Sequence, residues 1–412
     1  MLDLIAILIT LTALFSYLNH RFIGVPTTIG VMLISLAVSL LLVAADGLGL
    51  ANVSDMAEQL IGQIDFYAVL MDGMLSILLF AGAMHVNLRE LASFKWPIGV
   101  MASAGVIAST FLIGGGAYLL LELCGLSVSF IYCLVFGALI SPTDPIAVLG
   151  ILKSANAPKS LEVKIAGESL FNDGVAVVVF LVIADIATGK NLDVKDVATL
   201  LAVEALGGAA MGMLLGWMTF VLLRSIDQYD VEILLTLALV LGGYQLASYL
   251  HVSGPITMVV AGLMIGNHGR QTAMSQRTRE QVDTFWELLD ELLNAVLFVL
   301  IGLEVVVLSF TGQYLIAALL SIVLVLAVRL VCVGVPVQIM RRVFKMEFAP
   351  HAIKVLTWGG VRGGISVALA LSLPPSPERD VILAITYVVV LFSISVQGLS
   401  IGKLIQHTSK SA

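Results

Sequence analysis

Long apolar segments constrain this chain more than any other feature of its sequence. The segments are about 20 residues long and nearly free of charge, which is the length that a helix needs to cross a bilayer. Inside a bilayer the backbone must bond to itself, so each segment is expected to be helical. The sequence therefore predicts an all-α polytopic membrane protein with about thirteen transmembrane helices, near residues 1–20, 27–45, 65–85, 97–122, 128–151, 163–186, 197–223, 231–250, 255–267, 284–309, 313–340, 352–373 and 380–402.

Composition supports a membrane protein and excludes most other classes. Hydrophobic residues make up 59% of the chain and charged residues 12%, whereas charged residues make up about 25% of an ordinary soluble protein. No long basic tract is present, so nucleic-acid binding is not expected. The three cysteines and six histidines show no metal-ligand spacing, and no cofactor is predicted.

The basic residues predict the orientation of the spans. If the N-terminus is outside and the C-terminus is cytoplasmic, the inside loops hold most of the 21 Lys and Arg residues and the outside loops hold only Lys190, Lys195 and Arg379. This asymmetry follows the positive-inside rule. The chain starts Met-Leu-Asp-Leu, without the basic flank of a signal peptide, so we expect the first span to be retained. The location predicted is the inner or plasma membrane of a prokaryote.

Two carboxylates lie where hydrocarbon is expected. Asp144 is part of Pro142-Thr-Asp-Pro145, and Asp173 is part of Phe171-Asn-Asp-Gly174. An ionisable group at that depth costs several kcal/mol unless it is paired, hydrated or functional. The two prolines remove backbone donors beside the first acid, and such a break persists in a membrane only where it faces protein or water. Both acids are therefore candidate site residues.

The sixth span carries an oxygen-rich face. At about 100° per residue, four polar side chains fall on one side of this helix, namely Glu168, Ser169, Asn172 and Asp173. The broken fifth span would add Asp144, the Thr143 hydroxyl and carbonyls freed by the prolines. Hard cations such as Na⁺ prefer carboxylate, hydroxyl and carbonyl oxygens. We predict a cation site where these two spans meet.

A second break is predicted in span twelve, at Trp358-Gly-Gly-Val-Arg-Gly-Gly364. Four glycines around an arginine disfavour a straight helix. The breaks occupy matching places in two six-span halves joined by span seven, as expected for inverted repeats whose broken helices cross near the midplane. Span order alone supports this repeat. In span seven, Gly208, Gly212 and Gly216 are spaced for the close approach of another helix.

The remaining buried charges allow a structural interpretation. Asp144 and Asp173 could simply pair with Arg329 and Arg362 to hold the bundle together, although two acids with oxygen-rich neighbours exceed what two arginines need. For Glu168 an orienting ion pair is favoured over direct ligation. For Asp72 and Glu304, whose neighbours are apolar, a stabilising hydrogen bond or a vestibule role is favoured over ion binding.

A carboxylate that binds a cation also binds a proton, and the two compete for the same oxygens. If the loaded site can face either side in turn and the empty charged site cannot cross, the protein exchanges cation for proton and needs neither ATP nor a cofactor. Because Asn172 precedes Asp173 where a second acid could stand, the simplest exchange is one proton per Na⁺.

These motifs resemble those of the monovalent cation:proton antiporter superfamily, in particular the branch of bacterial and archaeal sodium/proton antiporters that is related to animal sodium/proton exchangers. The similarity covers Phe136-Gly-Ala-Leu-Ile-Ser-Pro-Thr-Asp-Pro-Ile-Ala-Val148, Gly167-Glu-Ser-Leu-Phe-Asn-Asp173, Val328-Arg-Leu330 and Trp358-Gly-Gly-Val-Arg-Gly-Gly364, in family order.

The resemblance implies roles for the site residues. Asp173 would be the principal ion and proton carrier, completed or supported by Ser169, Glu168 and the Thr143 carbonyl. Asn172 and Asp144 would shape the crossing. Arg329 would bridge to Glu168, and Arg362 matches the glycine-flanked arginine of span twelve.

The resemblance also implies a homodimer with elevator-type motion. Its dimer and scaffold side would comprise spans 1–3 (residues 1–90) and spans 8–10 (231–310). The moving core would comprise spans 4–6 (97–188) and spans 11–13 (313–408), and span seven (197–224) would link the halves. Asn-Asp in place of two aspartates resembles the electroneutral branch.

Three alternatives stay open at this point. A K⁺/H⁺ antiporter would share the same fold, since small changes in cavity size decide selectivity. An intramembrane aspartyl protease also uses two aspartates, but its Gly-x-Gly-Asp signature is missing here. A passive cation channel needs an open path lined by rings of charges or carbonyls, and no filter-like segment is present. We therefore expect the partners to be monovalent cations, protons and membrane lipids.

Overall fold

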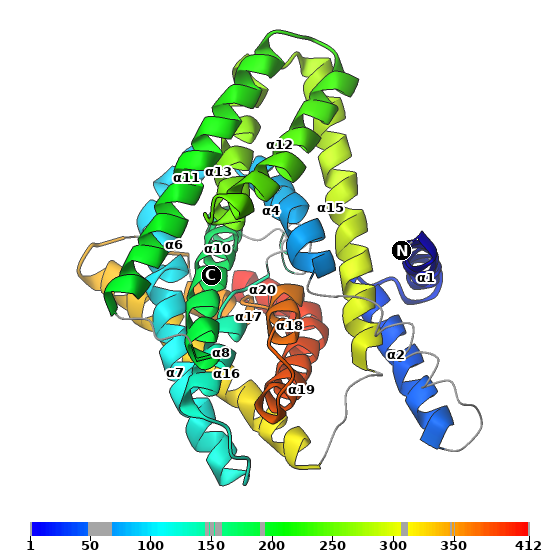
Figure 1. The fold of residues 1–412 in the computed structure, drawn as a ribbon, viewed down its shortest axis with the longest axis vertical. Coiled ribbons are helices and arrows are strands. Elements are labelled where there is room, and N and C mark those ends of the chain that lie inside the picture. The colour runs from blue at the N-terminus through cyan, green and yellow to red at the C-terminus, as the bar shows by residue number, and fades with distance from the viewer. Residues whose placement is uncertain are drawn as a thin grey trace.

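The structure is a computed structural model in which every element of the described residues is helical (Figure 1). It describes residues 2–47, 68–144, 148, 152, 159–189, 194–305, 312–346, 348–349 and 351–410. Within these residues, eight helices are long and apolar enough to cross a membrane, and shorter apolar helices accompany them. The prediction of an all-α polytopic membrane protein is confirmed, whereas the number of spans and the inverted repeat stay predictions.

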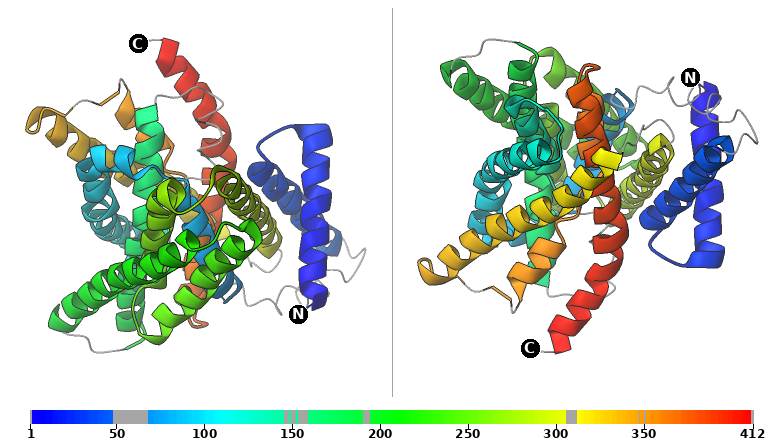
Figure 2. Two further views of the ribbon diagram at one scale, coloured as in Figure 1. Left: turned by 90° about the horizontal axis from the view of Figure 1, so that it is seen from above. Right: turned by 90° about the horizontal axis from the view of Figure 1, so that it is seen from below.

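The N-terminal helices lie at one edge of the molecule, as both views in Figure 2 show. Gly302 is one reason why α2 (Thr27–Gly47) and α15 (Gln276–Glu304) pack closely, because a Cβ there would lie 2.9 Å from the Met32 carbonyl oxygen. The Ser39 hydroxyl on α2 also donates to the Gly302 carbonyl at 2.9 Å. The elements at this edge are α1 (Leu2–Leu18), the π-helix η1 (Asn19–Ile23) and α2 (Thr27–Gly47). The π-helix η2 (Ala68–Met74) and α4 (Leu75–Met84) follow in the chain, and α4 packs inside the molecule against α13 (Gly254–Met264).

The middle of the chain forms the tall helices at the top of Figure 1. It comprises α11 (Val194–Arg224), α12 (Tyr229–Tyr249), α13 (Gly254–Met264), η3 (Ile265–Gly269), α14 (Arg270–Thr272) and α15 (Gln276–Glu304). Helix α15 begins eight residues before the predicted start of span ten, because the Ser275 hydroxyl caps it by accepting from the Thr278 amide at 3.4 Å. Such capping favours a helix start even in a polar segment.

Two further groups of helices surround the predicted site. The first consists of α5 (Leu88–Ser93), α6 (Lys95–Ala102), α7 (Ala104–Leu123), α8 (Phe130–Ile140) and α10 (Lys159–Ala187). The second consists of α16 (Gly312–Arg342), α17 (Ala352–Trp358), α18 (Gly364–Leu371), α19 (Pro377–Phe392), η5 (Ser393–Gly398) and α20 (Leu399–Lys410). Helix α8 packs against α7, α10, α18 and α19, so the two groups share one core.

The glycines of span seven do allow a close helix contact, as predicted. Gly208, Gly212 and Gly216 on α11 face α13, and a Cβ on Gly212 would lie 2.5 Å from the Thr257 carbonyl oxygen. Backbone atoms cannot move aside as a flexible side chain can. The spacing thus sets the distance between the two helices.

Gly212→Val is expected to destabilise the protein by about 1–3 kcal/mol, the usual cost of overpacking a close contact. The measurement is the thermal unfolding midpoint of the purified protein in detergent. Gly242→Val on α12 is the matched control, because a Cβ at Gly242 meets nothing within 4 Å. Equal midpoints for the two variants would contradict this packing role.

Candidate ion-binding site

Two non-helical segments meet within the helical core. Helix α8 ends at Ile140 and the chain from Ser141 to Asp144 is not helical, while α17 ends at Trp358 and α18 begins at Gly364. The Asp144 amide donates to the Val361 carbonyl at 2.7 Å, so the two non-helical segments are bonded to each other. The predicted break in span twelve is confirmed. The second half of span five, including Pro145, lies outside the described residues apart from positions 148 and 152.

Charges at the crossing complement the broken helix ends. Arg362 is 2% exposed, and its Nη1 donates to the carbonyls of Ser141 and Pro142, the latter at 2.9 Å. These carbonyls follow the C-terminal end of α8, where the helix dipole is negative and a cation is favourable. The Asp144 side chain lies against Gly363, the N-cap of α18, and a Cβ there would overlap it. A carboxylate at a helix N-terminus is likewise favourable.

Beside the crossing, hydroxyl and amide groups of α10 bond to Thr143. The Thr143 and Ser169 hydroxyl oxygens are 2.9 Å apart. The Asn172 amide donates from Nδ2 to the Thr143 hydroxyl at 2.9 Å and accepts from the Thr143 backbone N–H at 3.4 Å. All three side chains are at most 2% exposed. A small buried cluster of polar side chains thus joins this non-helical segment to the unbroken helix α10.

Asp173 follows this cluster on α10. It is 7% exposed, and within the described residues it has no hydrogen bond or ion pair. It lies close enough to Asp144 for the two carboxylates to interact electrostatically. A carboxylate that is buried without a partner is costly unless a proton or a cation neutralises it. In the described part of the chain no three His, Cys, Asp or Glu side chains gather as a metal site. The carboxylate and the neighbouring hydroxyls are oxygen ligands of the kind that hard cations prefer.

Glu168 on α10 pairs with Arg329 of α16. The pair is bidentate, with Arg329 Nη1 donating to Oε1 and Nη2 donating to Oε2 at 3.0 Å. Arg329 Nη2 also donates to the Leu356 carbonyl at 3.2 Å. Gly360 makes room for this guanidinium, because a Cβ there would lie 3.0 Å from its Cζ atom. The predicted ion pair is present, and both oxygens of Glu168 are engaged.

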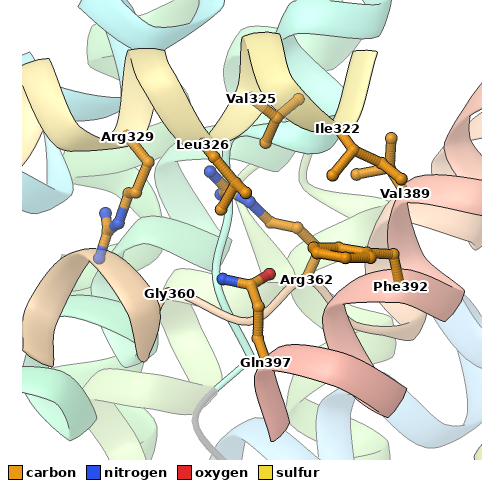
Figure 3. Close-up of a pocket in the computed structure, with 9 residues that line it drawn as sticks. All are labelled: Ile322, Val325, Leu326, Arg329, Gly360, Arg362, Val389, Phe392 and Gln397. Atoms are coloured by element: carbon orange, nitrogen blue, oxygen red, sulfur yellow. The ribbon is translucent and has the colours of Figure 1, made fainter. Parts of the chain in front are cut away.

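Two small cavities flank the crossing. One, drawn in Figure 3, lies between α16, the Gly360 segment and α19, with Arg329 and Arg362 on its wall. The other is lined by Ser109, Ser141, Glu168 and Asn172 among others. Each cavity has a volume of about 10 Å³. A single water therefore about fills either cavity.

A polar pair from span thirteen supports the crossing, and the sequence analysis did not identify it. The Ser393 hydroxyl accepts from the Arg362 backbone N–H at 2.9 Å and donates to Gln397 Oε1 at 2.6 Å. Gln397 Nε2 in turn donates to the Trp358 carbonyl at 3.0 Å. Both residues are at most 3% exposed. Their polarity within an otherwise apolar span was the available signal.

A buried lysine at the start of α10 was also missed. Lys164 is 1% exposed, and its Nζ lies 4.4 Å from the centre of the Phe94 ring and 4.3 Å from that of Phe348. The faces of aromatic rings attract cations. Phe94 precedes α6 and Phe348 precedes α17, so one ammonium connects both groups of helices to the helix that carries Asp173. We call these three residues the Lys164 clamp.

The structure thus brings most of the predicted site residues together. Thr143 contacts both Ser169 and Asn172, and Asp173 is near enough to Asp144 to interact with it electrostatically. Arg362 donates to the carbonyls of Ser141 and Pro142 beside them. Asp72 and Glu304, for which ion binding was not favoured, lie in helices other than those that form the crossing. Asp72 falls in η2, and Glu304 is the last residue of α15.

Comparison with known proteins identifies close relatives. The sequence profile of a family described as "Sodium/hydrogen exchanger, transmembrane" matches residues 7–407. The chain is 56% identical over 410 residues to the Na(+)/H(+) antiporter NhaP of Pseudomonas aeruginosa, covering 99% of this chain and 97% of that protein. It is 35% identical over 365 residues to the Na(+)/H(+) antiporter NhaH of Halobacillus dabanensis, covering 85% of this chain and 86% of the relative.

A solved structure shares the fold. The sodium proton antiporter MjNhaP1 from Methanocaldococcus jannaschii superposes with a TM-score of 0.74 and covers 98% of this chain and 97% of its own. Its sequence is 18% identical, so the likeness concerns the arrangement of the helices.

Proposed function

Because the chain belongs to the sodium/hydrogen exchanger family, we propose that it is a secondary antiporter that exchanges Na⁺ or Li⁺ for H⁺ across the membrane. The relatives at 56% and 35% identity are both named as Na(+)/H(+) antiporters. The observation that carries the proposal is the buried carboxylate of Asp173, which has no hydrogen bond or ion pair within the described residues and lies one helical turn from Ser169, whose hydroxyl contacts that of Thr143. A K⁺/H⁺ antiporter of the same fold is the alternative.

Asp173 is the proposed carrier. Its carboxylate, the Ser169 hydroxyl and oxygens of Thr143 would bind the cation, and a proton would bind the same carboxylate when the cation is absent. Only one of the two can neutralise the buried charge at a time. Glu168 is committed to Arg329 by two hydrogen bonds, which favours a supporting role for it. The binding site then carries either a cation or a proton, and no cofactor is needed.

We propose an elevator-type motion for the change of access. The moving core would contain residues 97–188 and 313–408, and residues 1–90 and 231–310 would form the scaffold and the dimer interface, linked by 197–224. The bonds between the two crossing segments and α10 support the core's moving as one body. The proposed protein is a homodimer in the prokaryotic plasma or inner membrane, with its N-terminus outside and its C-terminus in the cytoplasm.

Exchange is expected to be electroneutral, with one proton for each Na⁺. The neutral Asn172 amide bonds to Thr143, and Asp144 lies at the N-terminal end of α18, which leaves Asp173 as the single carrier acid. The test is transport by the purified protein in liposomes, with the membrane potential clamped at several values. The rate of Na⁺-driven proton movement should not change with potential. A rate that rises with an inside-negative or inside-positive potential would contradict the one-to-one exchange.

The same liposomes identify the cation. Na⁺ and Li⁺ should each drive proton movement at millimolar concentration, with K⁺ much weaker. An equal or greater response to K⁺ would favour the alternative. Cation flux without any coupled proton movement would indicate a channel and overturn the proposal.

A further inference from the structure

Tyr387 carries a buried hydroxyl that makes no hydrogen bond within the described residues. The residue lies on α19 and is 0% exposed, and its Oη has no hydrogen-bond partner among the described residues. The neighbouring hydroxyl of Thr386, equally buried, donates to the Ile382 carbonyl of its own helix at 2.7 Å. Buried polar groups are nearly always bonded, and an unbonded one is costly. The Tyr387 hydroxyl therefore needs a partner that this conformation does not provide.

A suitable acceptor lies nearby. Glu304, the last residue of α15, is close enough to interact electrostatically with both Tyr387 and Arg379, but it has no hydrogen bond or ion pair within the described ranges. Arg379, in the first turn of α19, donates Nη2 to the Leu371 carbonyl at 3.3 Å, and its buried Nε is unbonded. One carboxylate acceptor and two donors with spare capacity thus form a polar group that we call the Glu304 cluster.

The members of the Glu304 cluster belong to different bodies in the proposed mechanism. Glu304 ends α15, which packs against α2 through Gly302 and the Ser39 hydroxyl. Tyr387 and Arg379 are on α19, which packs against α16, α18 and α8. Figure 1 shows α15 standing between α2 and the group that contains α18 and α19. A shift of the core relative to the scaffold would change the distance from Glu304 to Tyr387.

We propose that the Tyr387 hydroxyl donates a hydrogen bond to the Glu304 carboxylate, beside Arg379, in the access state opposite to the one seen here. This inference rests on the proposed antiport and its moving core. Tyr387 and Glu304 are then positioning residues that hold one end state of the transport cycle. They act on the rate at which Asp173 changes sides and do not bind the transported ion.

Tyr387→Phe tests this proposal, because it removes only a hydroxyl that is unbonded here. Its thermal unfolding midpoint should equal or exceed that of the unsubstituted protein. Its turnover in Na⁺-driven proton movement in liposomes should fall by about three- to tenfold, the change expected when one hydrogen bond is lost. Thr386→Val is the matched control, since its hydroxyl is bonded within its own helix, and its turnover should stay within about twofold of the unsubstituted value.

A double variant tests whether the two residues act through each other. Glu304→Leu should slow turnover as Tyr387→Phe does, and the variant with both changes should be no slower than the slower single variant. Glu304→Gln keeps an acceptor without the charge and should keep more turnover than Glu304→Leu. Equal turnover losses in these two variants, with a raised KM for Na⁺, would assign Glu304 to cation attraction and overturn the proposal.

The outcomes separate this inference from the proposed function. If the unsubstituted protein moves no protons in response to Na⁺, the antiport proposal fails. If it exchanges normally and Tyr387→Phe matches it, or if the effects of Tyr387→Phe and Glu304→Leu multiply, the hydrogen bond is not part of the cycle.

Discussion

Asp173→Asn is expected to abolish Na⁺-driven proton movement in liposomes while the protein stays folded. Asparagine has the size of aspartate, but its amide neither takes up a proton at physiological pH nor offers a negative charge to a cation. Turnover should fall by at least about a hundredfold, because the carrier group itself is removed. The fold should persist, because Asp173 has no hydrogen bond or ion pair in the described part of the chain, and removing a buried unpaired charge relieves a cost.

The measurement needs a control on the same helix. Asp185 lies near the C-terminal end of α10, away from the crossing, and Asp185→Asn makes the same chemical change. Its turnover should remain near that of the unsubstituted protein, and all three proteins should elute as the same species from size-exclusion chromatography. Full exchange by Asp173→Asn would remove Asp173 as the carrier.

Arg329→Ala is expected to destabilise the protein by about 3–5 kcal/mol, the usual cost of leaving one member of a buried ion pair alone. Glu168 is 1% exposed and bonds to Arg329 through both carboxylate oxygens. The variant also leaves the Leu356 carbonyl without its donor. Because Glu168 precedes Ser169 on α10, loss of the pair should disturb the ion site, and transport should be lost with stability.

The comparison that isolates the ion pair uses two further variants. Arg329→Met combined with Glu168→Gln removes both charges and should recover part of the lost unfolding midpoint, since replacing a whole buried pair is far less costly than breaking it. Arg341→Ala removes an arginine that is exposed and donates to the Ala349 carbonyl at 3.2 Å, and it should cost less than about 1 kcal/mol. If Arg329→Ala folds and transports normally, the pair has no role.

The crossing could be predicted from the sequence because backbone chemistry creates it. Pro142 removes a donor, the glycines around Arg362 disfavour a helix, and both effects are local. The face of α10 followed from helical periodicity in the same way. The ion pair of Glu168 with Arg329 followed from family resemblance, since nothing local to either residue identifies its partner.

Other parts of the site depend on contacts between distant segments, which local patterns do not encode. Phe94 and Phe348 are ordinary aromatic residues in the sequence, and only the fold places them on either side of Lys164. Ser393 and Gln397 are one turn apart in span thirteen, but their bonds to the Arg362 and Trp358 backbones require the break in span twelve. Helix α15 begins at Gln276, before the predicted span, because the Ser275 cap stabilises a helix start in a segment whose polarity predicted a loop.

The Lys164 clamp has a consequence for a protein that works in changing acidity. An ion pair with a carboxylate, such as that between Lys159 and Glu90 at 2.7 Å, weakens when the carboxylate takes up a proton. The rings of Phe94 and Phe348 have no group that titrates, so their hold on the Lys164 ammonium does not weaken as acid accumulates. The joint that fixes the start of α10 is therefore insensitive to acid load, whereas Asp173, the proposed carrier further along the same helix, would respond to it. Proton uptake can then act on the carrier without loosening the frame that positions it.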